Sequence, residues 1–120
     1  MSELISEDVL RTKVSKLQTK ELIIIKFTAQ WCGPCKKIKD ICSRFEKLKP
    51  KSIQYYEIDI DESLELYMKM KKMKMVNGIP ALLAYTNTEK DHWYIPDISH
   101  LGSEQTGVEH FFNECIKYVA

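Results

Sequence analysis

Two cysteines separated by two residues have the clearest chemical potential in this sequence. Cys32 and Cys35 lie in the run Trp31-Cys32-Gly33-Pro34-Cys35-Lys36. Thiols at this spacing can close and open a disulfide without refolding the chain. If a helix begins near Cys32, its dipole and free N–H groups favour the thiolate at that sulfur, and Pro34 suits the first helical turn. We therefore predict that Cys32 is the nucleophile and Cys35 the resolving thiol.

The same spacing also makes up half of many zinc sites. A structural zinc ion needs two more ligands, and the remaining cysteines and histidines form neither a second CxxC nor an HxxxH pattern. They are Cys42, Cys115, His92, His100 and His110. We favour a redox pair and expect no metal, with zinc as the alternative.

The composition narrows the partners that we expect. With 120 residues, the chain has room for one domain over residues 1–120. Its 18 basic and 17 acidic side chains argue against nucleic-acid binding. No apolar run is long enough for a membrane span, and the start Met1-Ser2-Glu3 is unlike a signal peptide. We expect a cytoplasmic protein. Free thiols stay reduced in the cytoplasm, so a CxxC motif there is more often catalytic than structural.

The hydrophobic pattern alternates between strands and helices. The strand candidates are Leu4-Ile5, 22–27, 53–60, 81–85 and 92–95, the last two joined as a hairpin through 87–91. The helix candidates follow a cap at Ser6 and then cover 34–48, 63–73 and 106–119. The apolar strand 22–27 leads directly into the CxxC. This order predicts an α/β fold with a central mixed sheet and helices on both faces.

Several motifs, taken together with this order, resemble the thioredoxin family. They are the WCGPCK run after the central strand, Asp59-Ile60-Asp61, and Gly78-Ile79-Pro80 before the third strand. The resemblance covers almost the whole chain and implies the thioredoxin fold. It further implies a monomeric reductase of protein disulfides with no bound cofactor, whose electrons come from an NADPH-dependent thioredoxin reductase.

The resemblance also implies a substrate groove beside the CxxC. The Ile79-Pro80 bond should be cis, which would leave the Ile79 backbone free to pair with an extended substrate segment. The substrate-binding residues expected on this basis are Trp31, Gly33, Pro34, Ile79, Pro80 and Gly102.

Two charges depart from the pattern of the family. Thioredoxins usually carry a buried carboxylate in the central strand and a lysine on the neighbouring strand, whereas the matching positions here are Lys26 and Glu57. Side chains on adjacent strands can touch, because the strands lie about 4.8 Å apart. We predict that Lys26 and Glu57 form a buried pair and that Glu57, through water, deprotonates Cys35. The alternative is that the pair only preserves charge balance.

Other departures concern shape. Asp40 stands where the family usually has a helix-kinking proline, so we expect a straighter helix. Extra residues before Gly78 and a longer loop after the third strand are expected to alter the rim of the groove. Cys42 lies about 10.5 Å along the helix from Cys35, too far for a disulfide. We interpret Cys42 and Cys115 as buried apolar residues, with a regulatory thiol as the alternative.

Two other functions remain open at this point. One is a binding module that holds a partner through its groove, with slow or secondary redox chemistry; the exchanged charges at Lys26 and Glu57 leave room for it. The other is a disulfide oxidase or isomerase, because Gly33-Pro34 favours a reducing pair only by analogy with the family.

Overall fold

A mixed four-stranded sheet forms the centre of the computed structural model, which describes residues 4–120. Its strands are β1 (Leu22–Thr28), β2 (Ile53–Asp59), β3 (Ala81–Tyr85) and β4 (Ile98–Leu101). They lie in the order β2-β1-β3-β4. β2 is parallel to β1, whereas β3 is antiparallel to both β1 and β4. The central β1 carries the chain straight toward the two cysteines.

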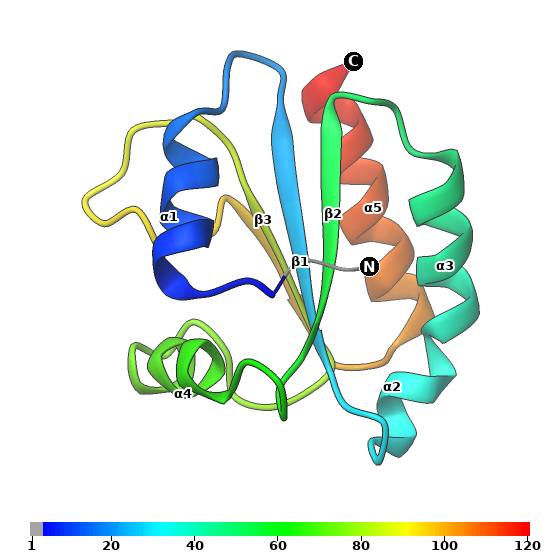
Figure 1. Cartoon of the computed structure of the whole chain (residues 1–120). Coiled ribbons are helices and arrows are strands. Elements are labelled where there is room, and N and C mark those ends of the chain that lie inside the picture. The colour runs from blue at the N-terminus through cyan, green and yellow to red at the C-terminus, as the bar shows by residue number, and fades with distance from the viewer. Residues whose placement is uncertain (1–3) are drawn as a thin grey trace.

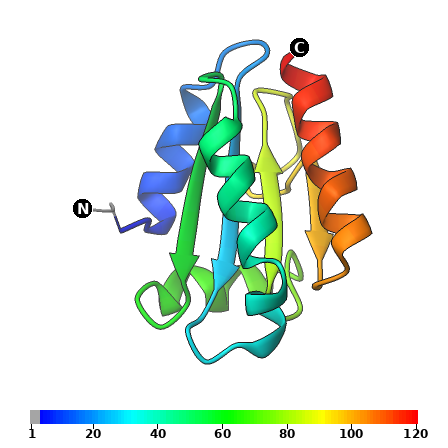
Figure 2. The same ribbon diagram turned by 90° about the vertical axis from the view of Figure 1, so that its right-hand side faces the viewer.

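Helices cover both faces of this sheet, as Figures 1 and 2 show. The helices are α1 (Glu7–Ser15), α2 (Gly33–Lys37), α3 (Lys39–Leu48), α4 (Leu64–Lys72) and α5 (Gln105–Val119). α1 and α4 pack on one face, α3 and α5 on the other, and α2 lies at the end of the sheet that β1 reaches (Figure 1). The predicted fold class is confirmed.

Side-chain alternation along β1 divides the core into two halves. Ile23, Ile25 and Phe27 belong to the core under α1 and α4, whereas Leu22 and Ile24 belong to the core under α3 and α5. Successive residues of a strand point to opposite faces. Lys26 therefore points toward the α3 side, although it is fully surrounded by the fold.

The helix that carries the CxxC is broken, which contradicts the single, straighter helix predicted over 34–48. α2 and α3 are separate, and Ile38 between them has φ −108° and ψ 5°. Its N–H group donates to the Cys35 carbonyl oxygen over 3.3 Å, and its own carbonyl accepts from the Cys42 N–H over 3.1 Å. The Ile38 side chain is completely buried at this point. The bend therefore coincides with a buried anchor and does not need a proline at Asp40.

The fourth strand is misplaced in the prediction. β4 is Ile98–Leu101 rather than 92–95, and the intervening segment has no strand. Trp93 and Tyr94 instead pack against the end of β3, where the Tyr85 hydroxyl donates to the Tyr94 carbonyl oxygen over 2.8 Å. The aromatic residues that produced the alternating pattern thus belong to a loop.

This loop, residues 86–97, lies far from the cysteines. Tyr85 pairs with Ile23 near the start of β1, whereas Ala81 pairs with Phe27 near its end. Asp97 closes the loop by accepting hydrogen bonds from the Thr86 N–H over 2.8 Å and from Lys90 Nζ over 2.7 Å. The expectation that this loop shapes the groove is therefore wrong.

At the start of the described chain, Leu4 and Ile5 form no strand, contrary to prediction, and Ile5 is buried in the core. The cap at Ser6 is confirmed, because its hydroxyl accepts from the Val9 N–H over 3.2 Å. The segment 1–3, which served the signal-peptide argument, lies outside the described residues. Within residues 4–120, no helix has the length and apolar character that crossing a membrane requires.

Candidate active site

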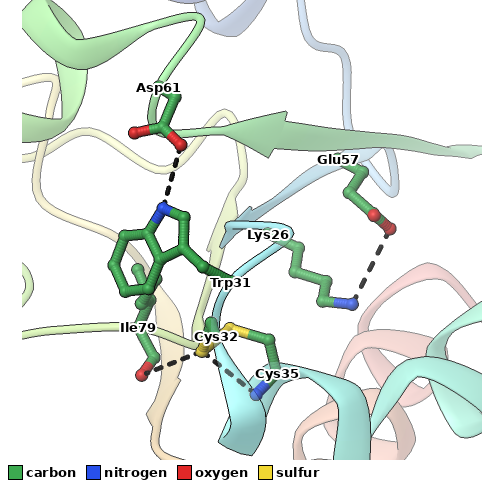
Figure 3. Close-up of a disulfide and its surroundings, with 7 residues drawn as sticks. All are labelled: Lys26, Trp31, Cys32, Cys35, Glu57, Asp61 and Ile79. Carbon is green, nitrogen blue, oxygen red and sulfur yellow. Dashed lines mark hydrogen bonds and ion pairs between the residues drawn. A yellow bond between two sulfur atoms is a disulfide. The ribbon is translucent and has the colours of Figure 1, made fainter.

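Cys32 and Cys35 are joined in a disulfide at the end of β1, with their Cα atoms 5.3 Å apart (Figure 3). The chain leaves β1 and turns, with the Cys32 N–H donating to the Ala29 carbonyl oxygen over 3.2 Å. α2 then begins at Gly33. The two predicted thiols are therefore close enough to exchange electrons as one couple.

Cys32 occupies the N-cap position of α2. Its Sγ atom accepts a hydrogen bond from the Cys35 N–H over 3.2 Å, and Pro34 lies in the first turn. The free N–H groups at a helix start stabilise negative charge on a sulfur. In the reduced protein, Cys32 is accordingly the sulfur that this geometry favours as a thiolate.

The disulfide is almost covered, and a large apolar side chain stands beside it. Cys32 and Cys35 are 4% and 3% exposed, whereas Trp31 is 65% exposed. The indole Nε1 of Trp31 donates to Asp61 Oδ2 over 2.9 Å. This contact of Asp61 was not predicted. The position of Asp61 directly after the predicted strand 53–60 is the signal that could have indicated it.

On the other side of Cys32 lie the residues before β3. The Ile79-Pro80 bond is cis, as the resemblance implies. The Ile79 carbonyl oxygen is 4.0 Å from Cys32 Sγ, a contact that becomes a hydrogen bond only when the sulfur carries a proton. The Gly102 N–H donates to the Pro80 carbonyl oxygen over 3.0 Å, and Gly102 has φ +123°, which favours glycine.

The structure thus places Ile79 next to Cys32, with Pro80 following it and Gly102 hydrogen-bonded to Pro80. Gly33 and Pro34 are exposed on α2, at the outer side of the disulfide.

Lys26 and Glu57 form the predicted ion pair. They are direct neighbours in the β1–β2 register, and Lys26 Nζ lies 3.7 Å from Glu57 Oε2 (Figure 3). Their surroundings differ: the Lys26 side chain is 2% exposed and that of Glu57 is 49% exposed. The prediction that both partners are buried is therefore wrong for Glu57, which lies at the mouth of the site.

A cleft of about 770 Å³ opens beside this pair and reaches Cys35. Lys26, Cys35 and Glu57 all border it. A water molecule occupies about 30 Å³ of liquid, so the cleft has room for a chain of water between the Glu57 carboxylate and Cys35.

Tyr55 and Cys42 lie near Lys26. Cys42 is buried, as predicted, whereas the sequence assigns no role to Tyr55. Tyr55 borders the same cleft, and its buried hydroxyl lies near the Cys42 thiol without a well-formed hydrogen bond. Burial raises the pKa of the Cys42 thiol, while the charge of Lys26 lowers it. The period of two along β2 places Tyr55 and Glu57 on one face and is the signal that could have found this cluster.

Cys115 lies on the buried side of α5, which confirms the prediction that it is buried. Burial, with a smaller effect of the Glu114 charge, raises the pKa of its thiol to about 12. In the part of the chain that the structure describes, no three side chains of the His, Cys, Asp or Glu type converge as a metal-binding group would.

Comparison with known proteins agrees with this geometry. Residues 3–100 match the family model described as Thioredoxin. Thioredoxin of Ophiophagus hannah is 33% identical over 82 residues, covering 68% of this chain and 72% of that protein. Thioredoxin-1 of Saccharomyces cerevisiae is 32% identical over 73 residues, covering 61% and 66%.

Among solved structures, the X-ray structure of Fasciola hepatica thioredoxin superposes with a TM-score of 0.71 at 20% identity, covering 95% of this chain and 98% of that one. At this identity the superposition establishes the fold alone. The family match, the sequence relatives and the disulfide together carry the assignment. The chain belongs to the thioredoxin family, and it is a thiol–disulfide oxidoreductase whose redox pair is Cys32 and Cys35.

Proposed function

We propose that this oxidoreductase works as a reductase of protein disulfides. The observation that carries the proposal is the position of Cys32, which caps α2 next to the Ile79 carbonyl group. An incoming disulfide can therefore contact both the sulfur that is favoured as a thiolate and the backbone of Ile79, which lies just before β3.

The first step is nucleophilic attack. The Cys32 thiolate attacks one sulfur of the substrate disulfide, a mixed disulfide forms, and the other substrate sulfur leaves as a thiolate. The backbone of Ile79 pairs with the substrate segment on either side of its cysteine. Trp31, Gly33, Pro34, Pro80 and Gly102 line this approach in the proposal.

The second step is resolution. Glu57 takes the proton of Cys35 through water in the cleft, and the Cys35 thiolate attacks Cys32 Sγ. The mixed disulfide breaks, the second substrate sulfur leaves, and Cys32 and Cys35 become the oxidised pair. Two electrons have then passed from the protein to the substrate.

The oxidised protein must be recharged by a two-electron donor. We assign this role to a thioredoxin reductase that uses NADPH, on the strength of the family. The chain needs no bound cofactor in this cycle, because both sulfurs and the proposed base belong to one polypeptide. For the same reason a monomer suffices. A reducing compartment such as the cytoplasm suits Cys42 and Cys115, which are free thiols.

Reduction of insulin disulfides, with dithiothreitol as electron donor, tests the proposal. The protein is expected to accelerate precipitation of the insulin B chain, and Cys32→Ser is expected to abolish the acceleration. A protein that binds insulin or other disulfide substrates but fails to accelerate their reduction would be a binding module instead.

A further inference from the structure

The buried charge nearest to the redox pair is positive. Lys26 is 2% exposed and borders the same cleft as Cys35. Figure 3 shows its ammonium group extending from β1 toward the space between Glu57 and the disulfide. A negative charge that forms on the sulfurs therefore forms beside the cleft that this buried cation borders.

Glu57 does not cancel this cation completely. Its side chain is 49% exposed and its oxygen is 3.7 Å from Lys26 Nζ, longer than a charge-assisted hydrogen bond. Water screens an exposed charge much more than a buried one. The field that reaches the interior of the site is consequently that of Lys26.

The two charges also act on a neighbouring thiol. Burial raises the pKa of Cys42 on α3, whereas the charge of Lys26 lowers it and the charge of Glu57 has only a smaller, raising effect. The other charged side chains around the cleft reach solvent and are screened. They are Lys36, Lys39, Glu46, Asp59 and Glu62.

We infer that Lys26 tunes the reduction potential of the Cys32–Cys35 couple, making the couple more oxidising by stabilising its reduced form. The disulfide is uncharged and gains nothing from the cation, whereas the thiolate formed on reduction is attracted to it. A couple whose reduced form is stabilised is a stronger oxidant. Lys26 acts through its charge and is a positioning residue rather than a catalytic one.

The inference rests on the redox pair of the proposed function and concerns its equilibrium. Reduction by glutathione is balanced: the protein disulfide and two glutathione thiols give the protein dithiol and one glutathione disulfide. Two electrons and two protons move to the protein, and a thiolate forms when one of those protons is released to solvent.

Equilibration with glutathione at pH 7, followed by alkylation and mass measurement, gives the equilibrium constant. We expect Lys26→Met to lower the constant for forming the dithiol about tenfold, which corresponds to a potential about 30 mV more reducing. We expect Glu57→Gln to raise it about two- to threefold, because the opposing charge is removed. A purely structural role would not move the two variants in opposite directions.

Each outcome decides the question. Should Lys26→Met fail to fold, Glu57→Gln at the half-exposed position decides alone, and an unchanged or lowered constant overturns the inference. Equal constants in the parent protein and Lys26→Met also overturn it and leave the proposed function intact. A parent protein that never equilibrates with glutathione would instead overturn the proposed function.

Discussion

Trp31 Nε1 donates a hydrogen bond to Asp61 Oδ2 over 2.9 Å, and this bond joins the segment before the nucleophile to the segment after β2. The indole is 65% exposed, so this one bond fixes a large side chain that packing alone does not hold. A fixed indole presents a preformed apolar wall to a protein substrate, because its ordering cost is met before binding.

Removing this bond is expected to weaken recognition of protein disulfides. Asp61→Ala should lower kcat/KM for insulin about two- to tenfold, the range of one hydrogen bond. Reduction of a small aromatic disulfide, which does not need the wall, should keep its rate. Asp91→Ala makes the same change of charge on the remote loop 86–97 and serves as the control. An equal loss with both substrates would mean that Asp61 affects Cys32 itself.

Glu57→Gln is expected to slow resolution of the mixed disulfide. General bases contribute factors of about 10² or more, so a hundredfold decrease at pH 7 is expected in a single turnover, with the first attack by Cys32 unchanged. Rapid acid quenching and mass measurement follow the mixed disulfide. Glu62→Gln changes another acid of the same cleft and provides the matched control. If Glu57→Gln resolves at the parent rate, the pair with Lys26 only balances charge.

Proline at position 40 is expected to be tolerated. Asp40 lies in the first turn of α3, where backbone N–H groups have no partner within the helix. Asp40→Pro should change the free energy of unfolding in urea by less than about 1 kcal/mol. Arg44→Pro, in the middle of the same helix, should cost about 3 kcal/mol or more. Equal losses for the two variants would show that the break at Ile38 does not begin a new helix.

Stability is expected to fall at alkaline pH. Burial raises the pKa of Cys115 from 9.0 to about 12. Between these values the unfolded chain has released a proton that the folded chain still holds, so the contribution is complete below pH 9 and is lost as pH rises toward 12. At pH 10.5 this thiol alone should lower the free energy of unfolding by about 2 kcal/mol.

Urea unfolding at pH 8 and pH 10.5 measures this loss, in a background with Cys32→Ser and Cys35→Ser that prevents disulfide exchange. Cys115→Ala should make the dependence on pH shallower by that amount. Cys42, Tyr55 and Tyr85 also have pKa values raised by burial, so part of the slope should remain. A slope identical with and without Cys115 would contradict the prediction.

Short motifs and runs of buried apolar residues are the reliable signals in this sequence. The redox pair, strands β1, β2 and β3 and the cis bond before Pro80 were predicted, because each depends on a short motif or a run of buried apolar residues. The neighbouring positions of Lys26 and Glu57 were predicted from the family pattern and strand spacing. The different exposure of the two side chains was not, since it depends on how α3 and the cleft cover one end of the pair.

The failures come from packing between distant residues. Trp93 and Tyr94 follow the pattern of a strand, yet the Trp93 ring packs on Tyr85 and the Tyr94 carbonyl oxygen accepts from the Tyr85 hydroxyl. β4 forms later, where Ile98 pairs with Ala84. The break at Ile38 follows from the burial of one side chain, which local propensity does not express. In both cases tertiary packing overrides the preference of the local sequence.

Loop 86–97 and the disulfide occupy opposite poles of the sheet. A fluorophore or an affinity peptide attached at Glu89, an exposed position of that loop, would therefore leave the approach of a client protein unobstructed. Attachment through loop 86–97 would immobilise this enzyme with Cys32 and Cys35 facing the solution.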